Sequence, residues 1–183
     1  MKKIIVLTAL ALISLSACTS SNDSKKVAMK QNKATLSESE LGDAKFAVIA
    51  FEGSMMEVQL GQLAQTNASD ASVKAFGTTM IDDHTRGNNE LKAIATRKNI
   101  TLPATIGERH QKEYNDLAKK TGSDFDKDYM DMMVEDHEKD IKLFEKEANE
   151  GKDEELKMWA SMTLATLRKH LEMAKGTESL VKK

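Results

Sequence analysis

The sequence contains little of what mixed α/β and disulfide-rich domains use to build their folds. It has one cysteine, so no disulfide can form within the chain, and one proline in 183 residues, so few segments are barred from being helical. Aromatic residues make up 4% of the chain, and no segment alternates apolar and polar residues with the period of two that strands show. Together with many alanine, leucine, methionine, glutamate and lysine residues, these absences predict an all-helical protein.

Positive charge is not concentrated anywhere in the chain. The 27 basic residues against 29 acidic ones give a net charge of −2, and without Lys2 and Lys3 the charge becomes −4. Basic and acidic residues are interspersed, so we expect no nucleic-acid partner. A glycine-rich phosphate loop, a Ser-His-Asp set and a Cys-His set are also missing, which leaves no pattern typical of those enzyme classes.

The first 17 residues have the order of a secretory signal peptide. Lys2 and Lys3 precede an apolar segment, residues 4–15, and small residues follow it. The apolar segment is too short to span a bilayer. The sequence therefore predicts that residues 1–17 are a signal peptide.

Cys18 follows this segment in the tetrapeptide Leu15-Ser16-Ala17-Cys18, which resembles a bacterial lipobox. In such a motif the cysteine is acylated and becomes the mature N-terminus, and acyl chains would hold the protein on a membrane. An ordinary signal peptide with a cysteine nearby is the alternative. An unpaired thiol in an oxidising compartment would be a liability, and this favours lipidation. We expect a lipoprotein of the cell envelope, attached to the outer membrane or facing the periplasm, with a flexible tether over residues 18–40.

Apolar residues recur at helical spacing from Leu41 onward, which predicts one domain over residues 41–178. Its roughly 140 residues suffice for a core of its own. Four long helices are expected over residues 43–66, 70–99 and 123–150 and from Asp153 onward, with a shorter helical segment over 105–120. Short turns at the first and third joins favour an antiparallel four-helix bundle, with the extra short helix between its second and third helices.

Four residues that can bind a metal fall on the inward stripes of the four long helices. They are Glu57, His84, His137 and His170. Imidazole and carboxylate groups that converge from facing helices are how bundle proteins build metal sites, and this set would suit zinc, iron or copper. Counted from the third join, His170 lies about one turn deeper than His137. A buried polar network without a metal is the alternative for the same residues.

Other residues near the histidines could support metal binding. Three carboxylates could accept a hydrogen bond from a ring N–H and so orient a ligand, namely Asp83, Asp136 and Asp140. Met80 and Met133 each precede a histidine by four residues, and their thioethers would select copper. Methionine more often fills an irregular core, and we favour that interpretation here. His110, with acidic neighbours on the short segment, is predicted to be a solvated surface residue without a role.

Several short motifs together resemble one known family of exported bacterial proteins, the domain of unknown function 4142 family. The motifs are Leu60-Gly61-Gln62-Leu63-Ala64, Met80-Ile81-Asp82-Asp83-His84, Phe125-Asp126-Lys127-Asp128-Tyr129, Met133-Val134-Glu135-Asp136-His137, and Trp159-Ala160 followed by His170-Leu171. The resemblance implies a ferritin-like helical bundle and an export route, and it implies no activity. Ferritin-like di-iron proteins use Glu-x-x-His pairs, and no histidine here has a glutamate three residues before it.

Two hypotheses follow for the function. In the first, the protein is an exported lipoprotein whose helical domain binds a transition metal in its core. In the second, it is a non-catalytic structural or interaction lipoprotein of the envelope, and its histidines form a buried polar network that fixes the helix register. The sequence shows no activated nucleophile and no clear acid–base pair, so an enzyme is the least favoured class.

Overall fold

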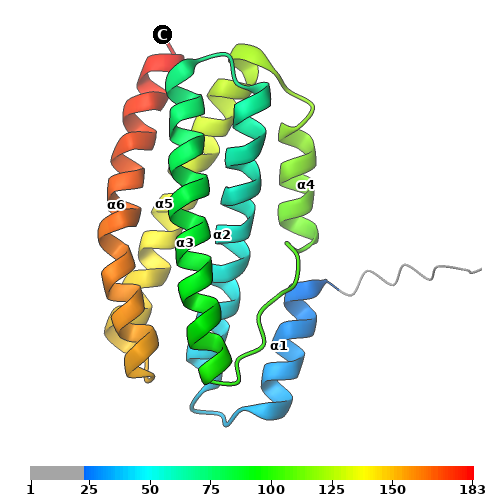
Figure 1. The fold of residues 1–183 in the computed structure, drawn as a ribbon, viewed down its shortest axis with the longest axis vertical. Helices are drawn as coiled ribbons and strands as arrows, with labels where there is room; N and C mark the ends of the chain where they lie inside the picture. Colours follow the sequence, from blue (N-terminus) through cyan, green and yellow to red (C-terminus); the bar gives the residue numbers. More distant parts are fainter. Residues whose placement is uncertain (1–22) are drawn as a thin grey trace, which may run out of the picture.

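The computed structural model describes residues 23–183, so the predicted signal peptide and Cys18 lie outside the described part of the chain. Within that part the chain forms helices and no strands, which confirms the all-helical prediction (Figure 1). The helices are α1 (Ser24–Thr35), α2 (Leu41–Asn67), α3 (Ala71–Arg97), α4 (Glu108–Leu117), α5 (Gly122–Glu150) and α6 (Glu154–Val181).

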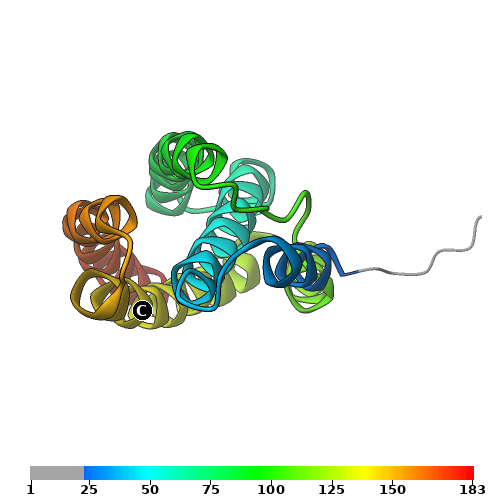
Figure 2. The same ribbon diagram turned by 90° about the horizontal axis from the view of Figure 1, so that it is seen from below.

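Four long helices, α2, α3, α5 and α6, lie side by side and form the body of the molecule (Figure 1). The closest pairs are consecutive in the chain, α2 with α3 and α5 with α6, and short turns join them. The short helices α1 and α4 follow one another along the long axis of the molecule (Figure 1), on the side of α2 away from α3 and α6 (Figure 2). None of the helices within residues 23–183 combines the length and the apolar character that crossing a bilayer requires.

Aspartate caps set where the second helix of each long pair begins. The Asp70 carboxylate accepts a hydrogen bond from the Ser72 N–H at 2.7 Å, and Asp153 accepts from Glu155 and Leu156, both at 3.1 Å. These bonds satisfy amide groups that have no partner within the helix. The sequence predicted that these helices begin at Ser69 or Asp70 and at Asp153, and the structure has Asp70 and Asp153 as the caps.

The turn of each long pair is also held by a carboxylate from the other pair. Asp126, near the start of α5, accepts N–H bonds from residues 69 and 70 at 3.1 and 3.0 Å. Asp43, near the start of α2, accepts N–H bonds from residues 152 and 153 at 3.1 and 2.7 Å. Each pair therefore fixes the turn of the other, and the arrangement is reciprocal.

Within the described residues the apolar core consists of two clusters with one polar layer between them. Along every long helix the apolar side chains change from one cluster to the other close to a glutamate or histidine. In α3, for example, Met80 belongs to one cluster and Leu91 to the other, and buried His84 lies between them. The corresponding residues of α2, α5 and α6 are Glu57, His137 and His170.

Residues 24–35 form helix α1, so the prediction of a flexible tether over 18–40 is wrong for this segment. Its apolar residues are too few to give a clear helical stripe, and its attachment is largely polar. The Asn32 side chain accepts a hydrogen bond from the Thr101 N–H at 2.7 Å and donates one to the Thr101 carbonyl at 2.9 Å. Lys25 forms an ion pair with buried Glu52 at 2.7 Å. The sequence signal for this helix was its cap, Asp23, which accepts an N–H bond from Lys25.

Candidate metal centre

The polar layer brings together one side chain from each long helix. Glu57, His84, His137 and His170 are all buried, with 3%, 7%, 0% and 1% of their surface exposed. Each is flanked by the apolar clusters described above. Buried imidazole and carboxylate groups are costly unless they find partners, so their contacts decide what the layer can do.

The three histidines converge on one point. One nitrogen from each ring lies within 4.8 Å of the corresponding nitrogens of the other two. The ring centroids of His84, His137 and His170 are 5.3–5.8 Å apart. His170 therefore lies in the same layer as His137, although residue counting had placed it a turn deeper. Nε2 of His137 is 3.3 Å from Nδ1 of His170.

The opposite nitrogens of these two rings are fixed by hydrogen-bond acceptors. Nδ1 of His137 lies 2.8 Å from the carbonyl oxygen of Met133, so this nitrogen carries the hydrogen. Nε2 of His170 lies 2.9 Å from Asp83, a carboxylate that also pairs with Arg86. Burial alone would raise the pKa of Asp83, but its bonds with His170 and Arg86 lower it, so it stays ionised and accepts.

These two hydrogen bonds leave a lone pair on each of the nitrogens that face one another. In the neutral rings, Nε2 of His137 and Nδ1 of His170 are both acceptors, 3.3 Å apart, and neither can satisfy the other. A cation between the two nitrogens would bind both lone pairs. Two nitrogen ligands of one tetrahedral zinc ion lie roughly 3.3 Å apart when each Zn–N bond is about 2.0–2.1 Å, so the observed spacing fits a shared metal ion.

His84 contributes a third nitrogen with the same character. Its Nδ1 lies 3.1 Å from the Ser54 hydroxyl and 3.0 Å from Glu57 Oε2. The Ser54 hydroxyl is within 3.3 Å of the His84 carbonyl, so it donates there and can accept from Nδ1. Nε2 of His84 has no hydrogen-bond partner among the described residues.

Glu57 lies at the edge of the histidine cluster. Its two oxygens are 3.0 Å from Nδ1 of His84 and 3.5 Å from Nδ1 of His137. Neither oxygen makes a hydrogen bond of good geometry within the described part of the chain. The carboxylate therefore faces the sides of these rings that carry hydrogens, where its negative charge would compensate for a bound cation.

Burial opposes protonation of the histidines and ionisation of Glu57. It lowers the pKa of His84 to about 4 and that of His170 to about 4, and it also lowers the pKa of His137. It raises the pKa of Glu57 to about 7, and the charge of Asp136 adds to that increase. Near neutral pH, protonation of either ring nitrogen is therefore unfavourable and does not satisfy the facing lone pairs. A metal ion would satisfy the lone pairs and favour the ionised form of Glu57.

The other predicted carboxylates have different positions. Asp83, on α3, accepts a hydrogen bond from His170 on α6 and not from His84, its neighbour in the sequence. Asp136 and Asp140 make no contact with a histidine ring like that of Asp83; they line a cavity of about 250 Å³ between α2 and α5. Burial raises the pKa of both, and for Asp140 the nearby charge of Glu57 adds to the effect.

Met80 and Met133 are fully buried in one apolar cluster. Their neighbours there include Met56, Leu60 and Phe76. This packing supports their interpretation as core residues, and the backbone carbonyl of Met133 accepts from the ring of His137.

His110 is buried, so its prediction as a solvated surface residue is wrong. Its Nδ1 lies 3.3 Å from Glu52, which also accepts the Gly107 N–H at 2.9 Å and pairs with Lys25. Burial would raise the pKa of Glu52, but these three partners lower it to about 2. The sequence did not reveal this cluster because Glu52 lies on the side of α2 that α1 and α4 cover.

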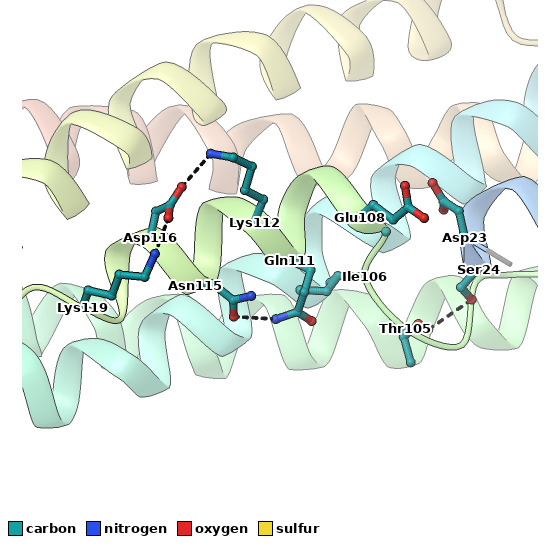
Figure 3. Close-up of a pocket in the computed structure, with 11 residues that line it drawn as sticks. Asp23, Ser24, Thr105, Ile106, Glu108, Gln111, Lys112, Asn115, Asp116 and Lys119 are labelled. Atoms are coloured by element: carbon teal, nitrogen blue, oxygen red, sulfur yellow. Dashed lines mark hydrogen bonds and ion pairs between the residues drawn. The ribbon is translucent and has the colours of Figure 1, made fainter. Parts of the chain in front are cut away.

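A wider hollow of about 510 Å³ lies between the start of α1 and α4, away from the histidines. Figure 3 shows that side chains of α4 along it pair with one another. Asp116 binds Lys112 and Lys119 at 2.7 and 2.8 Å, and Gln111 donates to Asn115 at 3.0 Å. These groups are exposed and already partnered, so the hollow does not compete with the histidine cluster as a metal site.

Comparisons with known proteins identify a family. Residues 26–177 match the family described as Domain of unknown function (DUF4142). The comparison with curated proteins and the comparison with solved structures gave no match. The matched region begins within α1 and includes the whole polar layer. Because it covers most of the sequence, the chain belongs to the DUF4142 family.

Proposed function

We propose that this protein binds one first-row transition metal ion, zinc, copper or iron, between His84, His137 and His170. In this proposal the four long helices form a ferritin-like four-helix bundle, and the domain is exported and held at the cell envelope by a lipid on Cys18. Glu57 compensates for the charge of the ion from the edge of the site, and Asp83 orients His170.

The facing ring nitrogens of His137 and His170 carry the proposal. Each ring donates its other N–H to a carbonyl or carboxylate oxygen. Metal-binding histidines are typically fixed in this way, because the second hydrogen bond sets the tautomer and the direction of the free lone pair. A metal-free network would place hydrogens between the rings, whereas here both nitrogens are acceptors 3.3 Å apart.

The chemistry of the ligand set limits which ion fits. Three imidazoles suit zinc, copper and iron, whereas calcium and magnesium prefer oxygen ligands. With neutral imidazoles, the two negative charges of Glu57 and Asp83 match a divalent cation. A cavity of about 40 Å³ lies beside His84, His170 and Glu57, and it has room for a water molecule as a further ligand.

Elemental analysis and equilibrium titration of the purified protein test the proposal. We expect one zinc, copper or iron ion per chain, and loss of that ion in the double variant His84→Ala His137→Ala. His110→Ala is the matched control, since it removes a buried histidine that lies outside the cluster. Saturation with metal at about 100 times Kd should raise the free energy of unfolding by about 2.7 kcal/mol. A metal-free protein that gains no stability from any of these ions would contradict the proposal and favour a structural network.

The proposed anchoring has its own test. Mass spectrometry of the N-terminus of protein taken from bacterial membranes should find an acylated Cys18. A peptide that still carries residues 1–17 would contradict both the signal peptide and the lipid anchor.

A further inference from the structure

A second cavity lies next to the histidine cluster, on the side covered by the two short helices. Its volume is about 250 Å³, and its lining comes from α1, α2, α4 and α5. The cavity of about 40 Å³ beside the histidines shares part of its lining with this second cavity. Glu57 and Asp140 line both cavities, so these two carboxylates separate the outer space from the metal centre.

The cations that line the outer cavity compensate only part of its negative charge. Three cations line it, and each is held by a glutamate that is not part of the lining. Lys25 pairs with Glu52 at 2.7 Å, Arg109 with Glu113 at 2.9 Å, and Lys139 with Glu135 at 3.0 Å.

The carboxylates that do line the outer cavity are Asp136, Asp140 and Glu57. Asp136 is a quarter exposed and reaches Lys139 at 3.6 Å. Glu57 is almost fully buried, and its oxygens make no hydrogen bond within the described residues. The three groups therefore run from a partly exposed position to a buried one that touches the histidines. Carboxylate oxygens can replace water molecules around a cation as it loses its hydration shell.

Gly53 keeps this cavity open on the side of α2. It lines the cavity one turn before Glu57, and a Cβ built at this position would meet no atom within 4 Å. Gly87 has the same property on α3, where it lines the smaller cavity beside the histidines. The two glycines therefore mark two alternative directions from which an ion could approach.

We propose that the metal ion reaches the histidines through the outer cavity, with Asp136, Asp140 and Glu57 as successive oxygen ligands. This inference rests on the proposed metal centre and adds the route by which it is loaded. The route between α3 and α6 is the less favoured one. Its carboxylate, Asp83, is already paired with His170 and Arg86. Gly87, Asn88 and Thr163, which also line it, are uncharged. Carboxylates attract cations and raise the rate of encounter, and neutral groups do not.

The rate of zinc uptake by the metal-free full-length protein tests the route. Stopped-flow mixing with Zn²⁺ and an indicator dye gives the rate, and a separate titration gives the affinity. Gly53→Leu fills the outer cavity, and it should slow uptake strongly while the affinity stays close to that of the wild type. Gly176→Leu is the matched control, an exposed glycine of α6 that also has open space around it. Gly53→Ala, with a smaller side chain, serves if the leucine variant folds poorly.

Removal of a charge gives an independent readout. Asp136→Asn should slow uptake by about tenfold at low ionic strength and weaken its dependence on salt, because electrostatic steering raises association rates by about 10–1,000-fold. Glu138→Gln, an exposed glutamate of the same helix, should load like the wild type.

Different results would contradict the proposed route and the proposed metal centre. Normal uptake by Gly53→Leu together with slow uptake by Gly87→Leu would overturn the route and place the entrance between α3 and α6. Normal uptake by Gly53→Leu, Gly53→Ala and Asp136→Asn would also overturn it, while the metal centre would stand. Failure of the wild type to bind zinc, copper and iron would overturn both.

Discussion

In the proposed metal centre, Asp83 lies outside the ligand set and fixes the orientation of one ligand, His170. It accepts the Nε2–H of His170 at 2.9 Å and so directs the Nδ1 lone pair towards His137. Asp83→Asn should lower metal affinity by about 10–100-fold, since a neutral amide fixes the tautomer less firmly and removes one compensating charge. Competition with a chelator measures the change. Asp82→Asn, at an exposed neighbouring position, should leave affinity unaltered, and equal losses in both variants would contradict the assignment.

Glu57 makes a prediction about pH in the metal-free protein. Burial raises its pKa to about 7 from the ordinary 4.5. The folded state then holds a proton that the unfolded chain releases between pH 4.5 and 7, so this group lowers stability as pH rises through that window. Glu57→Gln removes the contribution. The free energy of unfolding of the wild type, relative to the variant, should fall by up to about 3 kcal/mol across the window. If the free energies of unfolding of the wild type and the variant depend on pH in the same way, the pKa of Glu57 is not raised.

The close contact between α2 and α3 depends on two glycines. A Cβ at Gly61 would lie 2.6 Å from the carbonyl oxygen of Gly77, and a backbone atom cannot move aside easily. Gly61→Ala should therefore destabilise the protein by about 1–3 kcal/mol. Gly53→Ala, on the same helix but with open space around it, should be neutral or stabilising by up to about 1 kcal/mol. Denaturant unfolding compares the two, and equal effects would rule out the close contact as the cause.

Helix α1 is docked on the body by polar contacts, and Asn32 makes two of them with the Thr101 backbone. Asn32→Ala should cost about 1–3 kcal/mol, because it leaves backbone groups of Thr101 without partners. Hydrogen exchange should then show faster exchange in α1 than in α2 or α5. Lys33→Ala, at an exposed position, is the control. If α1 exchanges as fast in the wild type as in the variant, it is not held in place by this contact.

The helical architecture could be predicted from the sequence because it depends on local patterns. Helical spacing of apolar residues predicted the bounds of the long helices closely. The polar attachment of α1 and the burial of His110 could not be predicted, because both depend on contacts between distant segments. Neither the apolar spacing of α1 nor the acidic neighbours of His110 reveals Glu52, their common partner.

The candidate site was predictable only as a set of inward-facing residues. Helical spacing indicates that His84, His137 and His170 face the interior, and the structure places their rings together. The direction of each lone pair is set by partners that no spacing rule identifies, such as the Met133 carbonyl for His137. The similar Met80–His84 and Met133–His137 motifs do not lie on equivalent helices. The first motif is on α3, the second helix of its pair, and the second is on α5, the first helix of its pair. The carboxylates that hold the turns show that α5 corresponds to α2.

At the scale of the whole molecule, residues 23–183 form two apolar clusters separated by one polar layer, and we propose that this layer binds a metal ion. X-ray absorption spectroscopy of the zinc-loaded protein tests it directly. We predict nitrogen ligands at about 2.0–2.1 Å with the scattering pattern of three imidazoles. A shell of oxygen atoms without imidazole scattering, or a protein that holds none of zinc, copper and iron, would contradict it.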